Sequence, residues 1–169
     1  MQVPIDFVHP LFFQEEEMIE KQEEAPFPYA LKTVYFYYDI VDSAYVPWEK
    51  AEQSIPALLK LWNEEKAQLQ ALFAERNRTL VQKPMIRGLS YFIMLLFWMN
   101  QSKVTQLRMW QKAVESLPLK PMNCMERLQF IFQRCDTYPS FVQLNELFEE
   151  AAKLFYKKRA IVKKGMPPC

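Results

Sequence analysis

Basic side chains are concentrated near the C-terminal end of the chain. Six fall within twelve residues: Lys153, Lys157, Lys158, Arg159, Lys163 and Lys164. On a helix they would occupy one or two adjoining faces, where ammonium groups bind phosphate oxygens in a salt-sensitive way. This predicts an anion-binding or nucleic-acid-binding surface. The alternative, which we prefer, is a solvated helix end that complements its own dipole and the acidic N-terminal half.

The charges of the two halves of the chain differ in sign. Residues 1–79 hold 14 acidic and 7 basic side chains, which gives −7, whereas residues 80–169 hold 6 acidic and 14 basic side chains, which gives +8. Such asymmetry is typical either of a basic surface for an anionic partner or of two halves that pack on each other. We prefer packing, because it requires no outside partner.

Carboxylates are the other residues with possible chemistry. Six glutamates lie between Glu15 and Glu24, and on a helix some of them would share a face. A dimetal carboxylate site also needs Glu-x-x-His pairs, and the single histidine, His9, is in none. We therefore expect a solvated acidic segment and no metal. Acid–base pairs remain conceivable at Asp39 with Asp42 and at Glu64 with Glu65, although nothing distinguishes them from surface acids.

Several enzyme classes are excluded by what the chain lacks. Two glycines cannot make a glycine-rich phosphate loop, and there is no G-x-S-x-G motif. The three cysteines, Cys124, Cys135 and Cys169, have no zinc-site spacing. One helix carrying Cys124 and Cys135 would hold them about 16 Å apart, so we expect free thiols in a reducing cytoplasm. We expect no cofactor and lean against an enzyme.

The segment Met85–Met99 is the element around which the others must pack. Its uncharged run, from Gly88 to Gln101, is 14 residues long, whereas a membrane span needs roughly 20. Arg87 and Lys103 close this run on both sides. We therefore predict the buried central helix of a soluble protein without a transmembrane segment. Its buried residues should be Phe92, Leu95, Leu96 and at least one of Trp98 and Met99.

Apolar periodicity and capping residues predict five further helices. They span Tyr29 to Val41, Ser54 to Arg78, Ser102 to Leu117, Asn123 to Asp136, and Ser140 to the basic end. Lys83-Pro84 should separate the second from the central helix, and Ser140 with Gln143 should form a capping box. The fold class is all-α: a single-domain orthogonal bundle of about six helices over residues 1–169. Residues 1–27 should be partly irregular and acidic, and 165–169 a frayed tail.

Three sequence blocks resemble the YpoC-type proteins of Bacillus and its relatives. They are HPLFF (His9–Phe13), LLKLWNEEK (Leu58–Lys66) and SYFIMLLFWMNQ (Ser90–Gln101). None of them is a catalytic signature. The resemblance implies a small intracellular bacterial protein, and it supplies no active-site residue.

Together these patterns favour a non-enzymatic interaction or accessory protein whose partner is another protein or a second copy of itself. The alternative is a nucleic-acid-associated protein that binds phosphates through the basic C-terminal helix. No recognition module for nucleic acid is visible in the sequence.

Overall fold

The fold is all-α, as the sequence predicts. The structure is a computed structural model, and it describes residues 1–165. Within them lie six α-helices and three short 3-10 helices, with two isolated β-bridges near the N-terminus. The α-helices are α1 (Tyr37–Ile40), α2 (Ala51–Ala74), α3 (Arg78–Trp98), α4 (Trp110–Glu115), α5 (Cys124–Gln133) and α6 (Tyr138–Lys163). The 3-10 helices are Ile5–Phe7, Tyr29–Lys32 and Pro47–Glu49.

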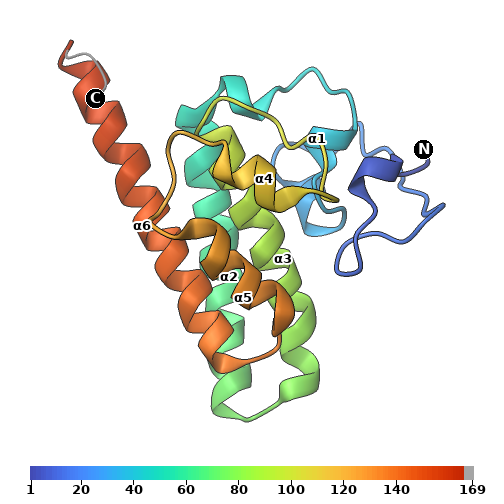
Figure 1. The fold of residues 1–169 in the computed structure, drawn as a ribbon. Coiled ribbons are helices and arrows are strands. Elements are labelled where there is room, and N and C mark those ends of the chain that lie inside the picture. The colour runs from blue at the N-terminus through green and yellow to red at the C-terminus, as the bar shows by residue number, and fades with distance from the viewer. Residues whose placement is uncertain (166–169) are drawn as a thin grey trace.

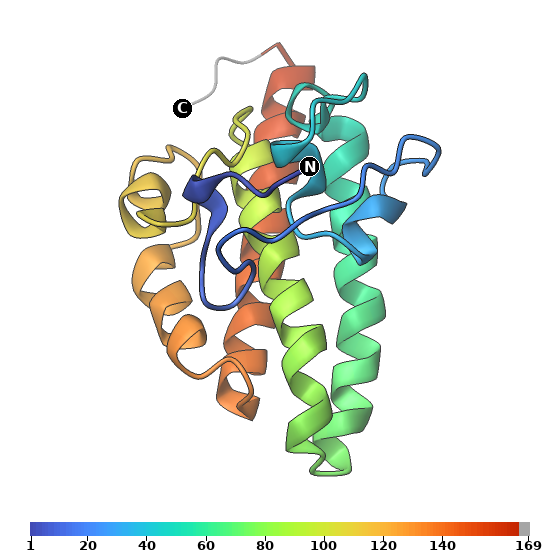
Figure 2. The ribbon, with the colours of Figure 1, turned by 90° about the vertical axis from the view of Figure 1, so that its right-hand side faces the viewer.

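The long helices α2, α3 and α6 run side by side along the length of the molecule (Figures 1 and 2). Helix α5 packs against α6 and is preceded by the short α4. Residues 1–36 lie on the opposite side of α3 from α6, as Figure 2 shows. The C-terminal end of α6 extends beyond the neighbouring helices (Figure 1). The basic residues therefore lie on the helix that reaches furthest from the acidic N-terminal segment.

Helix α3 is the centre of the core. Every residue from Gly88 to Trp98 is buried, and so is Met99, which confirms the prediction for Phe92, Leu95 and Leu96. By length and composition alone α3 could cross a membrane, yet 78% of its most apolar 18-residue window is buried within the protein. A helix that is apolar on all sides can be covered either by neighbouring helices or by lipid. The burial favours a core helix.

A close approach between helices explains the glycine in α3. A Cβ at Gly88 would lie 2.5 Å from Cζ3 of Trp62, a distance that real Cβ atoms do not show. The Trp62 indole, on α2, stacks on the ring of Phe148, on α6, with 4.6 Å between centroids. Its Nε1 donates to Oδ1 of Asn145 at 3.2 Å. The missing side chain at Gly88 thus lets three helices meet at one tryptophan.

The predicted starts of three long helices were wrong. Ser54 lies inside α2, and its hydroxyl donates to the Pro47 carbonyl at 2.8 Å. Pro84 does not separate two helices, because α3 already begins at Arg78 with Asn77 as its cap. Helix α6 begins before Ser140. A proline within the first two turns removes few intrahelical hydrogen bonds, so these helices begin upstream of their prolines.

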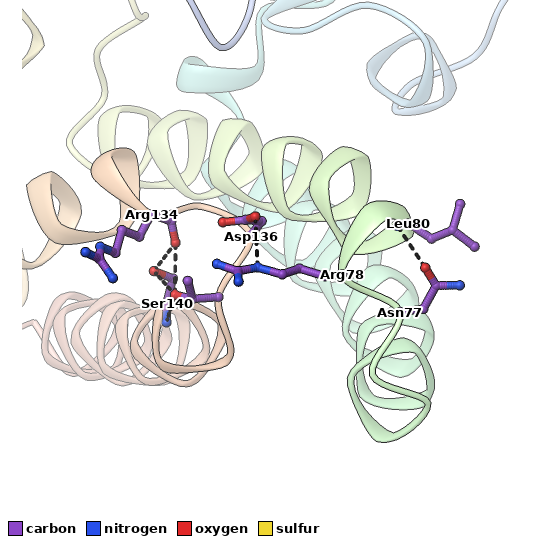
Figure 3. A network of polar contacts seen from close by, with 7 residues as sticks. Asn77, Arg78, Leu80, Arg134, Asp136 and Ser140 are labelled. Carbon is purple, nitrogen blue, oxygen red and sulfur yellow. Dashed lines mark hydrogen bonds and ion pairs between the residues drawn. The ribbon is translucent and has the colours of Figure 1, made fainter.

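Polar contacts fix these helix ends, as Figure 3 shows. The Asn77 side chain accepts from the Leu80 amide at 3.3 Å. The Arg78 guanidinium meets the Asp136 carboxylate at 3.2 Å and so ties the start of α3 to the α5–α6 connection. The Thr137 hydroxyl caps α6, and the Ser140 hydroxyl donates to the Arg134 carbonyl. Ser140, which was predicted to cap α6, therefore binds the Arg134 carbonyl of the α5–α6 connection instead.

The other predicted helices are shorter than expected. The helix expected from Tyr29 to Val41 is interrupted at Phe36, which has a φ of 55° and is fully buried. Its ring lies 5.1 Å from that of Phe12, so packing outweighs local helix preference there. The helix expected from Ser102 begins only at Trp110. The amides of Val104 and Leu107 instead donate to Asp39 and to the Asp6 carbonyl.

The cysteines differ from the prediction in one respect. Cys124 begins α5, but Cys135 lies beyond its end at Gln133, so the two are not on one continuous helix. Both are free and buried, as expected. Burial raises the pKa of each thiol to about 12, so neither ionises near neutral pH. Cys169 and most of the tail predicted at 165–169 lie outside the described residues.

Candidate partner-binding surface

The six basic residues of the C-terminal helix do not form one surface. Lys153 and Lys157 line a surface groove, whereas the other four do not. Because successive helical residues turn by about 100°, Lys164 falls within about 40° of those two, and Lys158 and Lys163 point elsewhere. The sequence prediction therefore grouped bases that belong to different faces of the helix.

Arg159 is committed to the bundle. Its Nη2 atom lies 2.9 Å from Oε2 of Glu52 on α2, and its side chain is only 24% exposed. The guanidinium also lies 6.0 Å from the centre of the Phe155 ring. Arg159 therefore pairs with an acid of the N-terminal half, as the alternative interpretation of the basic helix predicted. Arg159 thus helps to hold α6 against α2.

A groove separates α6 from the α4–α5 connection. Its volume is about 630 Å³, and more of its lining is apolar than polar. The apolar wall includes Leu154 and the strongly exposed Met122, whose residue exposure is 81%. The basic residues are Lys120, Lys153 and Lys157. The remaining lining residues are Pro118, Pro121, Asn123 and Glu150.

The groove is rigidly framed. The Lys120 ammonium donates to the carbonyls of Glu115 and Leu117 at 3.0 and 2.6 Å, which holds the end of α4. Arg127 binds the Glu150 carboxylate through two hydrogen bonds of 2.6 and 3.1 Å, which joins α5 to α6. Glu150 is therefore already occupied. Among the ion pairs of residues 1–165, none includes Lys153 or Lys157.

A second hollow continues the surface beyond the Arg127–Glu150 pair. It has a volume of about 510 Å³, lies between α5 and α6, and shares Asn123 with the groove. Phe130 lines it and is 44% exposed. We call the groove and this hollow together the α5–α6 face. The sequence analysis missed Lys120 and Met122, because they lie in the α4–α5 connection, which carries no periodic signal.

The acidic segment, residues 15–24, is on the other side of the molecule. All six of its glutamates are exposed, and none joins an ion pair among the described residues. Its backbone is tied to the N-terminus, because Val3 donates to the Glu17 carbonyl and Ile19 donates to the Met1 carbonyl. No group of metal-binding side chains occurs in residues 1–165. This segment is an ordered, unpaired acidic surface.

The packing of oppositely charged halves accounts for the asymmetry only in part. Of the five ion pairs in the described chain, two join an acid of the first half to a base of the second. These are Glu65 with Arg87 and Glu52 with Arg159. The acidic segment and the groove lysines contribute to neither pair. The six glutamates of the acidic segment and the two groove lysines therefore lie on opposite surfaces, and neither set forms an ion pair within the described residues.

Neither predicted acid–base pair shares a cleft: Asp42 lines a cavity of about 400 Å³, but its predicted partner Asp39 does not. Glu64 pairs with Lys32 and Glu65 with Arg87, so each carboxylate is already engaged. Asp42 is exposed, whereas Asp39 is buried and accepts from Trp98 Nε1 at 3.0 Å and from the Val104 amide at 2.7 Å. Burial raises the pKa of Asp39 to about 7. Its contacts give Asp39 a role in holding the fold.

His9 is likewise bound into the fold. Its Nδ1 accepts from the Leu11 amide at 3.1 Å, and its ring meets that of Phe132 edge-on at 5.2 Å. Burial lowers its pKa. These contacts join the N-terminal segment to α5.

Comparison with known proteins places the chain in a family. The model of the YpoC-like proteins matches residues 52–163, from the start of α2 to the end of α6, and so includes the α5–α6 face. Over 117 residues the chain is 36% identical to the uncharacterized protein YpoC of Bacillus subtilis strain 168, covering 69% of this chain and 71% of that one. No solved structure matches. The chain therefore belongs to the YpoC-like family.

Proposed function

We propose that the protein is a non-catalytic interaction protein and that the α5–α6 face receives an acidic segment of a protein partner. The observation that carries the proposal is the groove, in which unpaired Lys153 and Lys157 flank an apolar wall that includes the exposed Met122. An exposed apolar wall loses unfavourable contact with water when it is covered, and the lysines select an anionic occupant.

The composition of the groove favours protein over nucleic acid. Single-stranded nucleic acid is held by several aromatic platforms together with a basic channel, whereas no aromatic side chain lines the groove and Phe130 is the single aromatic residue that lines the neighbouring hollow. Its wall of proline, leucine and methionine suits aliphatic side chains instead, because methionine adapts to irregular apolar partners. A peptide that offers both carboxylates and an aliphatic anchor satisfies the lysines and the wall at the same time.

Binding assays with two labelled probes test this function. One probe is a glutamate peptide with methionine at every fourth position, and the other is an oligothymidylate. We expect fluorescence polarisation to show peptide binding that weakens with salt. The double change Lys153→Gln and Lys157→Gln should weaken it about tenfold, because two groove charges are lost. The matched control, Lys158→Gln with Lys163→Gln, removes the same charge from other faces and should change binding little.

Each contrary result has a definite meaning. Tighter binding of the oligothymidylate, with the same dependence on Lys153 and Lys157, would replace the protein partner by nucleic acid. Equal weakening by the test and control variants would move the site away from the groove. Absence of binding by either probe at low salt would overturn the proposal.

A further inference from the structure

We infer that the occupant of the groove is the acidic segment, residues 15–24, of a second copy of this chain. The inference rests on the proposed function of the groove, and it names the partner. The segment carries six glutamates and one lysine, a net charge of −5, whereas the groove on the same molecule is lined by three lysines and one glutamate. A chain that presents both surfaces supplies each copy with the complement of the other.

The acidic segment has the apolar anchor that the groove calls for. Met18 lies among the glutamates and is 67% exposed, whereas the next residue, Ile19, is buried. On the groove side Met122 is the most exposed of the large apolar residues in the described part of the chain. Methionine side chains adapt to irregular apolar surfaces, so the two exposed methionines can pack against each other. The charges that surround them have opposite signs on the two surfaces. Docking would cover both of them.

The segment is also held ready to bind. The N-terminal ammonium of Met1 donates to the Ile19 carbonyl at 3.0 Å, and Val3 donates to Glu17 at 2.8 Å. The Glu17 carboxylate accepts from the Gln14 amide at 2.9 Å and so closes the turn. A loop ordered before binding loses less conformational entropy when it docks. The glutamates of the segment therefore already lie on an ordered surface before a partner binds.

The arrangement requires a second molecule and sets the form of the assembly. Residues 1–36 and α6 lie on opposite sides of α3 (Figure 2), so the segment cannot enter its own groove. Surfaces that face opposite ways also cannot pair reciprocally across a two-fold axis. Such a contact is head-to-tail, and repeating it produces an open chain or a ring. The expected assembly grows with concentration and dissociates as salt screens the charges.

Charge reversal on each surface tests the inference with the full chain. The groove variant carries Lys153→Glu and Lys157→Glu. The segment variant carries Glu15→Lys and Glu20→Lys, whose side chains make no described hydrogen bond or ion pair. The control variant reverses Glu49 and Glu75, which are exposed acids elsewhere. Weight-average mass is measured by light scattering over a range of concentrations, at low and high salt, and circular dichroism verifies that each variant is folded.

The expected pattern is specific. The unmodified protein and the control should increase in mass with concentration at low salt, without a plateau at twice the monomer mass, and should become monomeric at high salt. The groove and segment variants should each remain monomeric when alone. An equimolar mixture of the two should form one-to-one complexes, because the unchanged acidic segment of the groove variant meets the unchanged groove of the segment variant. Recovery on mixing cannot come from a misfolded variant.

Other outcomes overturn the inference. A monomeric unmodified protein at every concentration and at low salt would refute it, and so would association that persists in either reversed variant or a mixture that stays monomeric. The function proposed above has its own readout, because peptide binding that depends on Lys153 and Lys157 can coexist with a monomer. That combination would leave the groove a binding site for a different acidic protein.

Discussion

The long helices and the irregular segments of this protein are stabilised in different ways. In α2, α3 and α6 the backbone hydrogen bonds are internal, and apolar stripes join the helices to one another. Residues 1–36 and 99–109 instead satisfy their backbone through short local turns and a few contacts with distant parts of the chain, such as the Leu107 amide with the Asp6 carbonyl. The comparison teaches that the long helices depend on regularly placed apolar side chains, whereas the irregular segments depend on buried aromatic side chains together with a few specific polar contacts.

The largest expected effect is in the helical region. Leu95 is fully buried at the centre of α3, so Leu95→Ala leaves a cavity that surrounding helices cannot fill. We expect the free energy of unfolding to fall by about 2–5 kcal/mol. Chemical denaturation with an unchanged slope would measure it. A loss below about 1 kcal/mol, smaller than the usual cost of such cavities, would contradict the central place of α3.

The polar contacts of the irregular segments should respond to pH. Asp39 joins α1 to Trp98 and Val104, and burial raises its pKa to about 7, although nearby Lys103 opposes this shift. The unfolded carboxyl ionises near its ordinary pKa of 3.8, so between that pH and about 7 the native state holds the extra proton. Stability from this group therefore decreases as pH rises through that window.

Asp39→Asn tests this contribution. The amide oxygen can still accept hydrogen bonds, but the residue no longer titrates, so the decline between about pH 4 and about pH 7 should become shallower. The difference between the two proteins should approach about 1.4 kcal/mol for each unit by which the pKa is shifted. Denaturation curves at several pH values measure it. Parallel pH profiles would show that Asp39 keeps an ordinary pKa in the folded protein.

The same difference explains which features could be predicted from the sequence. The buried residues of α3 follow from its uncharged run, and the stripe Phe141, Leu144, Phe148, Ala151 and Phe155 of α6 follows from helical spacing. The break at Phe36 could not be predicted in this way, because it depends on aromatic rings far away in the chain. The late start of α4 likewise depends on the contacts of Val104 and Leu107.

In the candidate surface, too, the helical part could be predicted from the sequence and the irregular part could not. Its basic helix was visible in the sequence, because charge density needs no knowledge of the fold. The groove was not visible, since Lys120 and Met122 reach it through the α4–α5 connection. The sequence also gave no means of separating Arg159 from its neighbours. That separation depends on Glu52, which lies more than one hundred positions earlier in the chain.

The smallest expected effect concerns how the basic end of α6 is shared between the bundle and the groove. The Arg159–Glu52 pair is partly exposed, with 24% and 67% of the two side chains accessible. A double-mutant cycle with Arg159→Gln and Glu52→Gln should give a coupling energy of about 0.2–1 kcal/mol that decreases with salt. The more buried Arg87–Glu65 pair, measured in the same way, should couple more strongly and respond less to salt.

Neither Arg159→Gln nor Glu52→Gln should alter peptide binding at the groove. A loss of binding with Arg159→Gln as large as that with Lys153→Gln and Lys157→Gln would show that the bases of α6 act as one surface after all.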